Sequence, residues 1–384
     1  MSLPRTLLRD FWDIVGTTRR QLRRLAVSPG LVVAYARFRG DIKRRDWKTL
    51  QAKLRPLADA ALRAKDFRIL IELAAAAARL DQPQLGAELA QVGRRLKGIG
   101  EASDWRGEDI ADATLVVRLS EAGEREVATG MPLAGHIRAA SMRARRTLVL
   151  ADARMVPLYR RSLPALTVMP LDADWRSGLD GRVVTAGLAD LQFNLGYDVS
   201  TIARLRVPLV ADATEARELR ERYRGGADIP LVGMSWYAPQ YGKDLSPPAL
   251  WARLVQAVPA RFVSLQRNPD LAAVEVLQAG QPGRVIVDPS VDQMANIDRF
   301  ASQIAALDLV VTVSNTGAHL TGSLGKPMIV VRDDLFRLNW PHLSRRVPWY
   351  PDAIVIGKDG RNWQSMFDDI IAEMKAMLAA PKTV

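Results

Sequence analysis

The chain of 384 residues lacks cysteine entirely and has only three histidines, His136, His319 and His342. The absence of cysteine excludes disulfides, thiolate catalysis and cysteine-ligated metals, and so few histidines argue against a histidine-rich metal site. No apolar run reaches about 18 residues, so the sequence predicts no transmembrane helix. The first residues carry scattered charges and no small-residue cleavage site, which argues against a signal peptide. These absences favour a cytoplasmic protein, and we expect neither a metal nor a cofactor.

Acidic residues are scarce only in the first quarter of the chain. The formal net charge is +12, and residues 1–100 hold 21 basic against 9 acidic residues. Residues 101–384 hold 33 of each kind and are neutral overall. A nucleic-acid enzyme would be expected to carry basic residues around its cleft. The neutral body therefore argues against a nucleic-acid partner and gives the basic first quarter a docking role.

The first hundred residues carry helical periodicity. Apolar residues recur at spacings of three, four and seven beside a group of arginines: Leu8, Phe11, Trp12, Val15 and Leu22. Such a basic amphipathic helix lies on an anionic membrane surface or packs on neighbouring helices, so residues 1–50 are a candidate membrane-surface or protein contact. Residues 46–97 predict further helices, broken near Asp66 and near Pro83. They resemble a degenerate helical-hairpin repeat of the tetratricopeptide type.

From about residue 105 short apolar runs alternate with amphipathic helices, a pattern typical of βαβ units and parallel sheets. We predict two sets of strands: 114–119, 147–151, 166–169 and 182–185, then 230–236, 261–266, 284–288 and 309–313. A charged helix over 214–225 separates the sets. The expected fold class is α/β, with two Rossmann-like domains, 101–212 and 213–384, facing a cleft after an all-helical segment, 1–100.

The segment 307–331 is the strongest functional signal. It reads as a strand, a small polar turn, a helix and a second strand; the turn holds Ser314, Asn315, Thr316 and Gly317, and His319 lies just inside the helix. Small residues at a helix start present free N–H groups and the positive end of the helix dipole, which favours phosphate. The alternatives are simple N-capping by Asn315 or Thr316 and a core role for His319. A nucleotide or nucleotide-sugar is therefore the first partner to consider.

Polar residues at two other strand ends add to this site. Ser235 and Trp236 end the strand predicted at 230–236, and the loop after it carries Lys243. Lys243 would bind phosphate as a point charge, or would be a solvated loop lysine. Gln266 ends the next strand and would touch the nucleoside, or would only mark where the strand leaves the core. Trp236 would stack on a base or pack structurally.

Five motifs occur in a fixed order along the second half: V-G-M-S-W (232–236), F-V-S-L-Q (262–266), D-Q-M-A-N-I-D-R-F-A-S-Q-I-A-A-L-D-L-V-V (292–311), S-N-T-G-A-H-L-T-G-S-L-G-K-P (314–327) and P-W-Y-P (348–351). They resemble the C-terminal half of glycosyltransferases related to the heptosyltransferase family, family 9, especially bacterial members fused to tetratricopeptide repeats. W-R-G-E-D (105–109), T-L-V-V-R (114–118) and L-Y-R-R-S-L-P (158–164) resemble the N-terminal half. The resemblance implies a GT-B fold and metal-independent sugar transfer from a nucleotide-sugar donor to a glycolipid, polysaccharide or protein acceptor.

The chain departs from that family in two places. The family tends to show D-T-G-x-x-H, whereas this chain has N-T-G-A-H, one residue shorter and without the acid. An inverting transfer also needs a carboxylate to take the acceptor's proton, which the family supplies from a G-L-G-D-like turn. Here residues 118–132 read R-L-S-E-A-G-E-R-E-V-A-T-G-M-P; Glu124 is the preferred base, with Glu121 and Glu126 as alternatives. If the turn is an ordinary charged one, the protein would be a degenerate transferase serving as a scaffold or regulator.

The residues after the strand predicted within 307–331 have two interpretations. They include Arg332, Trp340 and Trp349. They would line the cleft, with a tryptophan against donor or acceptor, or pack beneath a C-terminal loop.

Overall fold

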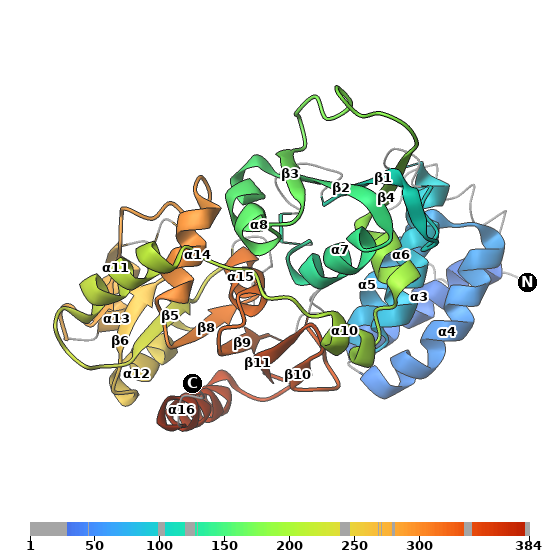
Figure 1. Ribbon diagram of the computed structural model, residues 1–384. Coiled ribbons are helices and arrows are strands. Elements are labelled where there is room, and N and C mark those ends of the chain that lie inside the picture. The colour runs from blue at the N-terminus through green and yellow to red at the C-terminus, as the bar shows by residue number, and fades with distance from the viewer. Residues whose placement is uncertain are drawn as a thin grey trace, which may run out of the picture.

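The computed structural model describes residues 29–44, 46–98, 104–119, 127–128, 130–238, 246–267, 269, 271–278, 281–333 and 340–380. Along the chain, a helical domain is followed by two α/β domains (Figure 1). The basic segment expected at Leu8–Leu22 lies outside the described residues. Within the residues described, no helix is both long and apolar enough to cross a lipid bilayer.

The helical domain, residues 29–98, contains α3 (Pro29–Arg44), α4 (Trp47–Ala64), α5 (Phe67–Arg79) and α6 (Pro83–Lys97). The helices break where the sequence predicted. Asp66 caps α5 by accepting hydrogen bonds from the Arg68 and Ile69 amides at 3.1 and 3.2 Å, and Pro83 opens α6, where a missing N–H costs no helical hydrogen bond. A Cβ on Gly86 would lie 2.9 Å from the Ala74 carbonyl oxygen, so glycine allows α5 and α6 to pack closely. A tetratricopeptide-type repeat stays a prediction.

The first α/β domain has a parallel four-stranded sheet in the order β3-β2-β1-β4. Its strands are β1 (Ile110–Arg118), β2 (Ala144–Ala151), β3 (Thr167–Pro170) and β4 (Val183–Gly187). Both faces of β1 are buried: Leu115 and Val117 join the main core, while Val116 packs with Trp175 on the other face. A strand covered on both sides reads as a continuous apolar run, which explains why β1 was recognisable in the sequence.

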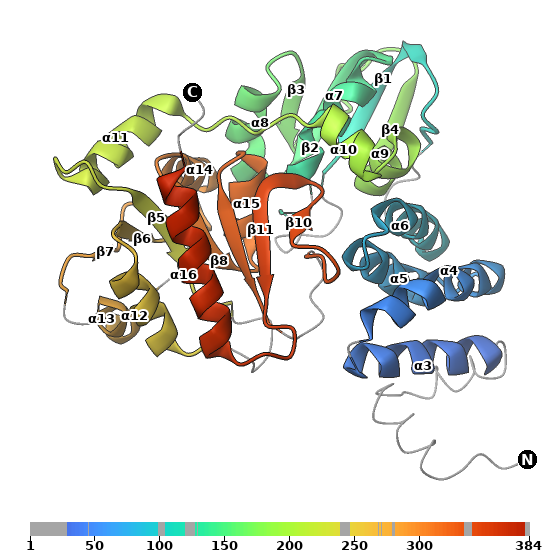
Figure 2. The ribbon, with the colours of Figure 1, turned by 90° about the horizontal axis from the view of Figure 1, so that it is seen from below.

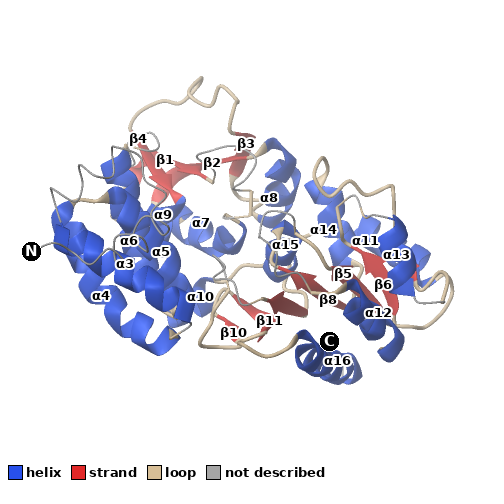
Figure 3. Ribbon diagram, turned by 180° about the vertical axis from the view of Figure 1, so that it is seen from behind, coloured by secondary structure: helices blue, strands red, loops and turns tan. Residues whose placement is uncertain are grey.

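The helices of this first domain are short. They are η2 (Met131–Leu133), α7 (Ala134–Ser141), η3 (Ala153–Met155), α8 (Val156–Ser162), α9 (Leu188–Leu195) and α10 (Val199–Leu205). α7 packs on β2 and on α9, and α9 in turn packs on α6 of the helical domain (Figures 2 and 3).

The second α/β domain has a seven-stranded sheet in the order β10-β11-β9-β8-β5-β6-β7. Its strands are β5 (Leu231–Ser235), β6 (Arg261–Ser264), β7 (Val285–Ile286), β8 (Leu309–Val313), β9 (Met328–Arg332), β10 (Arg346–Val347) and β11 (Tyr350–Gly357). All pairings are parallel except that of β10 with β11. Numbered within the domain, the parallel strands run 3-2-1-4-5-6, the order of a doubly wound dinucleotide-binding sheet.

Helices cover both faces of this second sheet. They are α11 (Ala213–Arg224), α12 (Pro248–Ala257), α13 (Leu271–Gln278), α14 (Ile297–Ala305), α15 (Thr316–Ser323) and α16 (Trp363–Ala379). α12, α13 and α16 pack in one apolar cluster, and α11, α14 and α15 in another on the opposite face. Figure 2 shows α16 lying across its face of the sheet.

The predicted fold class is confirmed: two parallel α/β domains follow a helical segment, and each predicted strand overlaps an observed one. One expectation was wrong. The segment 348–351 was placed after the last strand, but it forms the turn from β10 into β11 and the start of β11. Pro348 and Pro351 flank Trp349 and Tyr350, and proline is uncommon inside a sheet, so a strand starting here has no clear local signal.

The two α/β domains are joined by a buried interface. Arg161 of α8 makes a two-point ion pair with Asp298 of α14, at 2.8 and 2.9 Å, and donates to the Val210 carbonyl oxygen at 3.2 Å. The Leu209 amide donates to the Ser323 carbonyl oxygen at 2.8 Å. Buried apolar residues of both domains form one continuous cluster. These contacts therefore fix the position of one sheet's carboxyl edge relative to that of the other.

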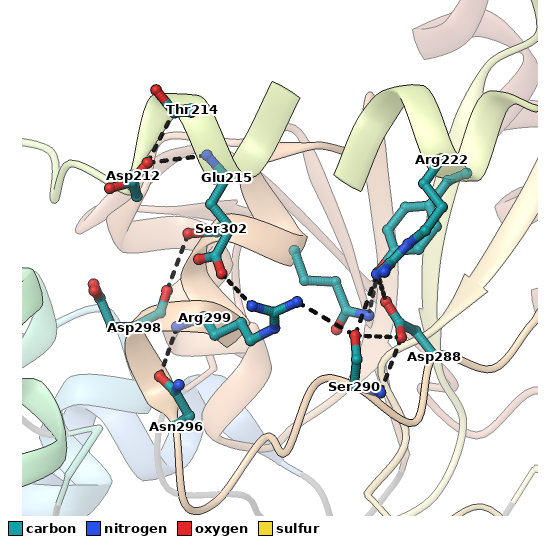
Figure 4. Close-up of polar contacts among 12 residues, drawn as sticks. Asp212, Thr214, Glu215, Arg222, Asp288, Ser290, Asn296, Asp298, Arg299 and Ser302 are labelled. Carbon is teal, nitrogen blue, oxygen red and sulfur yellow. Dashed lines mark hydrogen bonds and ion pairs between the residues drawn. The ribbon is translucent and has the colours of Figure 1, made fainter. Parts of the chain in front are cut away.

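The helix α11, which follows the interdomain segment, is fastened to α14 by polar contacts (Figure 4). Asp212 caps α11 by accepting hydrogen bonds from the Thr214 and Glu215 amides, both at 3.0 Å. Glu215 pairs with Arg299 of α14 at 2.6 Å. Arg222, farther along α11, pairs with the almost fully buried Asp288. The Glu215–Arg299 pair links α11 to α14, and α14 packs against α15, the helix that carries the candidate site.

Candidate functional site

The candidate site lies where the strand order of the second sheet reverses, between β5 and β8. In open parallel sheets, ligands bind outside the carboxyl ends of the strands at this switch point. Ser235 is the last residue of β5, and Asn315 follows β8 and caps α15. The Asn315 side-chain amide donates from Nδ2 to Ser235 Oγ at 2.9 Å, so one hydrogen bond spans the switch point.

Residues 314–317, which run from the turn before α15 into its first two residues, have the geometry of a phosphate cradle. Asn315 has an extended backbone, and its Oδ1 accepts a hydrogen bond from the Ala318 amide at 2.9 Å. All four residues are partly exposed. The amides of Thr316 and Gly317 donate to no other residue in the described ranges. Two open N–H groups at the positive end of a helix dipole can hold a diphosphate.

Glycine at position 317 has a packing reason as well. A Cβ there would lie 3.1 Å from Phe300 Cζ and 3.2 Å from Asn315 Oδ1. The first turn of α15 thus lies tightly against α14, and a larger residue would have to displace the cap or the phenyl ring. N-capping, the alternative interpretation of Asn315, is observed, and it leaves the amides beside it open.

Gln266, two residues after β6, joins this arrangement from the other side of β5. Its side chain is buried, with 7% exposure. Its Oε1 accepts hydrogen bonds from Ser235 Oγ, from the Trp236 amide and from the Tyr237 amide, at 3.1, 3.2 and 3.0 Å. Its Nε2 donates to the Tyr237 carbonyl oxygen at 3.0 Å. The structure therefore brings together Ser235, Gln266 and Asn315 from three strand ends.

The aromatic residues at the end of β5 take opposite positions. Trp236 is buried in the core beneath α12 and α16, whereas Tyr237 is 41% exposed. Tyr237 is therefore the aromatic side chain that β5 offers at the edge of the site. Sequence reasoning considered only Trp236; the W-Y pair was the available signal, but nothing in it told which ring is buried. Lys243 lies outside the described residues, and its role stays a prediction.

His319 lies beneath the cradle among aromatic rings. Its Nδ1 is 3.1 Å from the hydroxyl of Tyr350, and its ring stacks on Trp340 with centroids 5.1 Å apart. Burial lowers the pKa of His319 to about 4, so the imidazole is neutral at pH 7. A neutral, buried imidazole supports the cradle by packing and brings no positive charge to a phosphate. Trp340 and Trp349 are buried in the same cluster, which agrees with packing and not with lining a cleft.

The other side of the site comes from the first α/β domain. β1 ends at Arg118, and η2, which follows the turn after β1, packs against α15. The candidate bases Glu121, Glu124 and Glu126 lie outside the described residues, so they stay predictions.

Tyr159 of α8 is a residue that sequence reasoning missed. Its hydroxyl is buried without a hydrogen-bond partner within the described part of the chain, and burial raises its pKa. A Cβ on Gly130, just before η2, would lie 3.3 Å from this hydroxyl. Unpartnered buried hydroxyls are uncommon. The Tyr159 hydroxyl therefore places a polar group beside Gly130, inside an otherwise apolar cluster.

Among the residues described, no group of three or more histidines and carboxylates is arranged to hold a metal ion. The positive end of α15 is instead the feature suited to negative charge.

Two Rossmann-like domains in series, with the cradle of the second sheet facing an element of the first, define the GT-B fold. No family model matches the chain. The chain is similar to protein FlbA of Caulobacter vibrioides, at 23% identity over 269 residues. This match covers 65% of the chain and 44% of FlbA, so the chain spans less than half the length of that relative.

Three solved structures are similar in fold. E. coli ADP-heptose lps heptosyltransferase II matches with a TM-score of 0.48 at 15% identity, over 69% of this chain and 98% of its own. A glycosyl transferase of family 9 from Veillonella parvula matches with 0.47 at 12%, over 72% and 99%. E. coli heptosyltransferase WaaC with ADP matches with 0.45 at 14%, over 69% and 99%. The three matches are to heptosyltransferases and to a family 9 glycosyl transferase, at identities of 12–15% and TM-scores below 0.5.

Proposed function

We propose that the protein is a glycosyltransferase that moves a sugar from a nucleotide-sugar donor to an acceptor. The donor binds to the second α/β domain, with its diphosphate on residues 314–317, and the acceptor binds to the first. The observation that carries this proposal is the Asn315–Ser235 hydrogen bond across the switch point, beside the open amides of Thr316 and Gly317. Donors aimed at a departing diphosphate stabilise the charge that develops on it.

The proposed reaction is inverting and needs no metal. Glu124, or Glu121 in its place, takes the proton of the acceptor hydroxyl while the sugar leaves the diphosphate. The N–H groups and the dipole of α15 stabilise the negative charge that develops on the departing diphosphate. The acceptor class is a glycolipid, a polysaccharide precursor or a protein, in the cytoplasm or at the inner face of the membrane.

Thr316 allows a sharp test of the cradle, because it is the first residue of α15. Proline is favoured at that position and lacks an N–H, and the extended Asn315 before it suits a following proline. Thr316→Pro therefore removes one open amide and keeps the helix. Thr316→Ala is the matched control, since it removes the hydroxyl and keeps the amide.

Binding of ADP, UDP, GDP and CDP would be measured by calorimetry and by melting temperature, since a ligand that binds the folded state raises it. We expect at least one diphosphate to bind. Thr316→Pro should weaken that binding about 10-fold or more, because a hydrogen bond to a charged group is worth about 1.5–3 kcal/mol. Thr316→Ala should weaken it less. Equal binding by Thr316→Pro and the unchanged protein would place the ligand elsewhere.

The second candidate is a degenerate transferase that serves as a scaffold or regulator. The observation that favours it is the sequence of residues 118–132, which has lost the glycines and the aspartate of the family turn. Transfer assays on Glu124→Gln and Glu121→Gln separate the two. If the unchanged protein binds a diphosphate but shows no sugar transfer, and neither variant alters its cellular function, the scaffold explanation holds.

Deleting the helical domain would not make a clean test of the scaffold. Asp190 of α9 accepts hydrogen bonds from Gln91 and Arg95 of α6, at 3.0 and 3.2 Å. At the second α/β domain, the His342 amide donates to the Arg79 carbonyl oxygen at 3.0 Å. Because the helical domain packs on both α/β domains, its removal would expose their cores. Substitutions on its outer surface are the appropriate perturbation.

Residues 1–50 and the basic outer surface of the helical domain are the proposed docking region, for a membrane surface or a protein. Arg37, Lys48 and Arg63 are exposed and form no ion pair within the described residues. Each basic residue near an anionic membrane contributes about 1 kcal/mol. Replacing all three with glutamine should weaken sedimentation with phosphatidylserine vesicles and leave diphosphate binding unchanged. Vesicle binding unaffected by these replacements and by salt would exclude a membrane role for this surface.

A further inference from the structure

The carbonyl oxygen of the Gln266 side chain is fully engaged by the protein itself. Its carbonyl oxygen accepts three hydrogen bonds and its Nε2 donates one, all to residues at the end of β5 or just after it. A carbonyl oxygen has two lone pairs, so no acceptor capacity remains for a ligand. Gln266 is thus placed to hold neighbouring residues.

The hydrogen bonds that connect Gln266, Ser235 and Asn315 have a fixed order of donors and acceptors, and this order extends to the cap of α15. Ser235 donates its only hydroxyl proton to Gln266, so its lone pairs face Asn315. Asn315 must then present Nδ2 to Ser235, which turns Oδ1 toward the Ala318 amide that it caps. Without the Gln266 acceptor, the Ser235 hydroxyl proton would no longer have a fixed position. The side-chain amide of Asn315 would then no longer be held in one orientation.

We propose that Gln266 is a positioning residue of the phosphate cradle, acting through Ser235 and Asn315. It sets the orientation of the cap, and the cap sets the first turn of α15, whose open amides receive the phosphate. Through the Tyr237 backbone it also holds the chain leaving β5 beside the cradle. This inference rests on the proposed function for its ligand, and it assigns Gln266 a role other than the nucleoside contact expected from the sequence.

The test compares two variants along this path with a matched control. Gln266→Met keeps the length of the side chain and removes all its hydrogen bonds. Ser235→Ala removes only the hydroxyl that connects Gln266 to Asn315. The control is Gln303→Met, because Gln303 is fully buried in the same domain but donates to the Tyr223 hydroxyl on α11, away from the cradle.

Dissociation constants would be measured for whichever of ADP, UDP, GDP and CDP binds the unchanged protein most tightly. Gln266→Met and Ser235→Ala should each weaken binding about 10-fold, the effect of about 1.4 kcal/mol. The double variant should be scarcely weaker than either one, because both act on the same orientation. Gln303→Met should lower the melting temperature and leave the dissociation constant unchanged. A purely structural Gln266 would behave like Gln303, and that result would overturn the proposal, as would full additivity of the two variants.

Hydrogen exchange separates this inference from the proposed function. The amides of α15 should exchange faster in Gln266→Met and Ser235→Ala than in Gln303→Met, with or without a nucleotide present. If no diphosphate binds the unchanged protein but this exchange pattern appears, the proposed function fails while the positioning role of Gln266 stands. Unchanged exchange in α15 contradicts the positioning role directly.

Discussion

Acid should destabilise this protein through two buried histidines, His319 and His342. Burial lowers the pKa of His319 to about 4 and that of His342 to about 2; at His342 the positive charges of Arg332 and Arg79 lower it further. In the unfolded chain both imidazoles titrate near pH 6.5. Below that pH the unfolded state therefore binds protons that the folded state does not. Stability is fully present above about pH 6.5 and falls as the pH drops toward the folded pKa values.

The size of this effect follows from the width of the window. One pKa unit corresponds to about 1.4 kcal/mol, and between pH 6.5 and pH 5 neither folded imidazole takes up an appreciable share of a proton. Each histidine thus lowers the free energy of unfolding by about 2 kcal/mol over about 1.5 pH units, and the two together by about 4 kcal/mol. A domain has about 5–15 kcal/mol in total, so unfolding at moderately low pH becomes measurable.

Urea denaturation at several pH values between about 7 and 5 would check this for the unchanged protein, His319→Gln and His342→Gln. Each variant lacks one titrating imidazole. The difference in unfolding free energy between the unchanged protein and the variant should therefore become smaller by about 2 kcal/mol as the pH falls. The carboxylates contribute equally to all three proteins and cancel in the difference. Parallel pH profiles for the variants and the unchanged protein would refute the reasoning.

Three further predictions concern packing, the domain interface and the exposed aromatic ring. Gly322→Ala would place a Cβ against the ring of the buried Tyr350, so urea denaturation should show a loss of about 1–3 kcal/mol in unfolding free energy. An unchanged denaturation midpoint would contradict this contact. A double-mutant cycle on Arg161 and Asp298 should give a coupling of about 1 kcal/mol, because the pair is two-pointed and mostly shielded from solvent; zero coupling would mean that the pair does not hold the domains together. Tyr237→Ala should weaken nucleoside diphosphate binding about 10-fold if the ring stacks on the base, with little change in melting temperature because the side chain is 41% exposed; a large fall in melting temperature with binding intact would assign the ring a packing role.

The strands could be predicted because their signals are local. β8 was placed at 309–313, where it is observed, since a run of β-branched and leucine residues between polar turns has few alternatives. α9 and α10 were not predicted, because helices of 8 and 7 residues complete only about two turns and their period alone does not identify them. β11 was not predicted, because prolines lie at and just before its start, where they are uncommon in a strand.

The members of the site could be proposed from the sequence, but not their contacts. Ser235, Gln266 and Asn315 stood out as polar residues at strand or helix ends. Ser235 is 31 residues from Gln266 and 80 from Asn315, and no local pattern states that the three side chains meet. Similarly, the turn beside His319 was visible, whereas the aromatic rings around the histidine come mainly from residues 340 and 350.

The sequence by itself determined the alternation of strands and helices, the helices within residues 29–98 and the small polar turn that opens α15, because each depends on neighbouring residues and local hydrogen bonds. The tertiary structure alone decided the strand order, and with it that β5 and β8 lie side by side at the switch point. It also decided that Gln266 faces the protein, that His319 is buried and neutral, and that Tyr237 and not Trp236 is exposed. These outcomes depend on packing between segments far apart in the chain, which sets burial, and burial sets both pKa and hydrogen-bond partners.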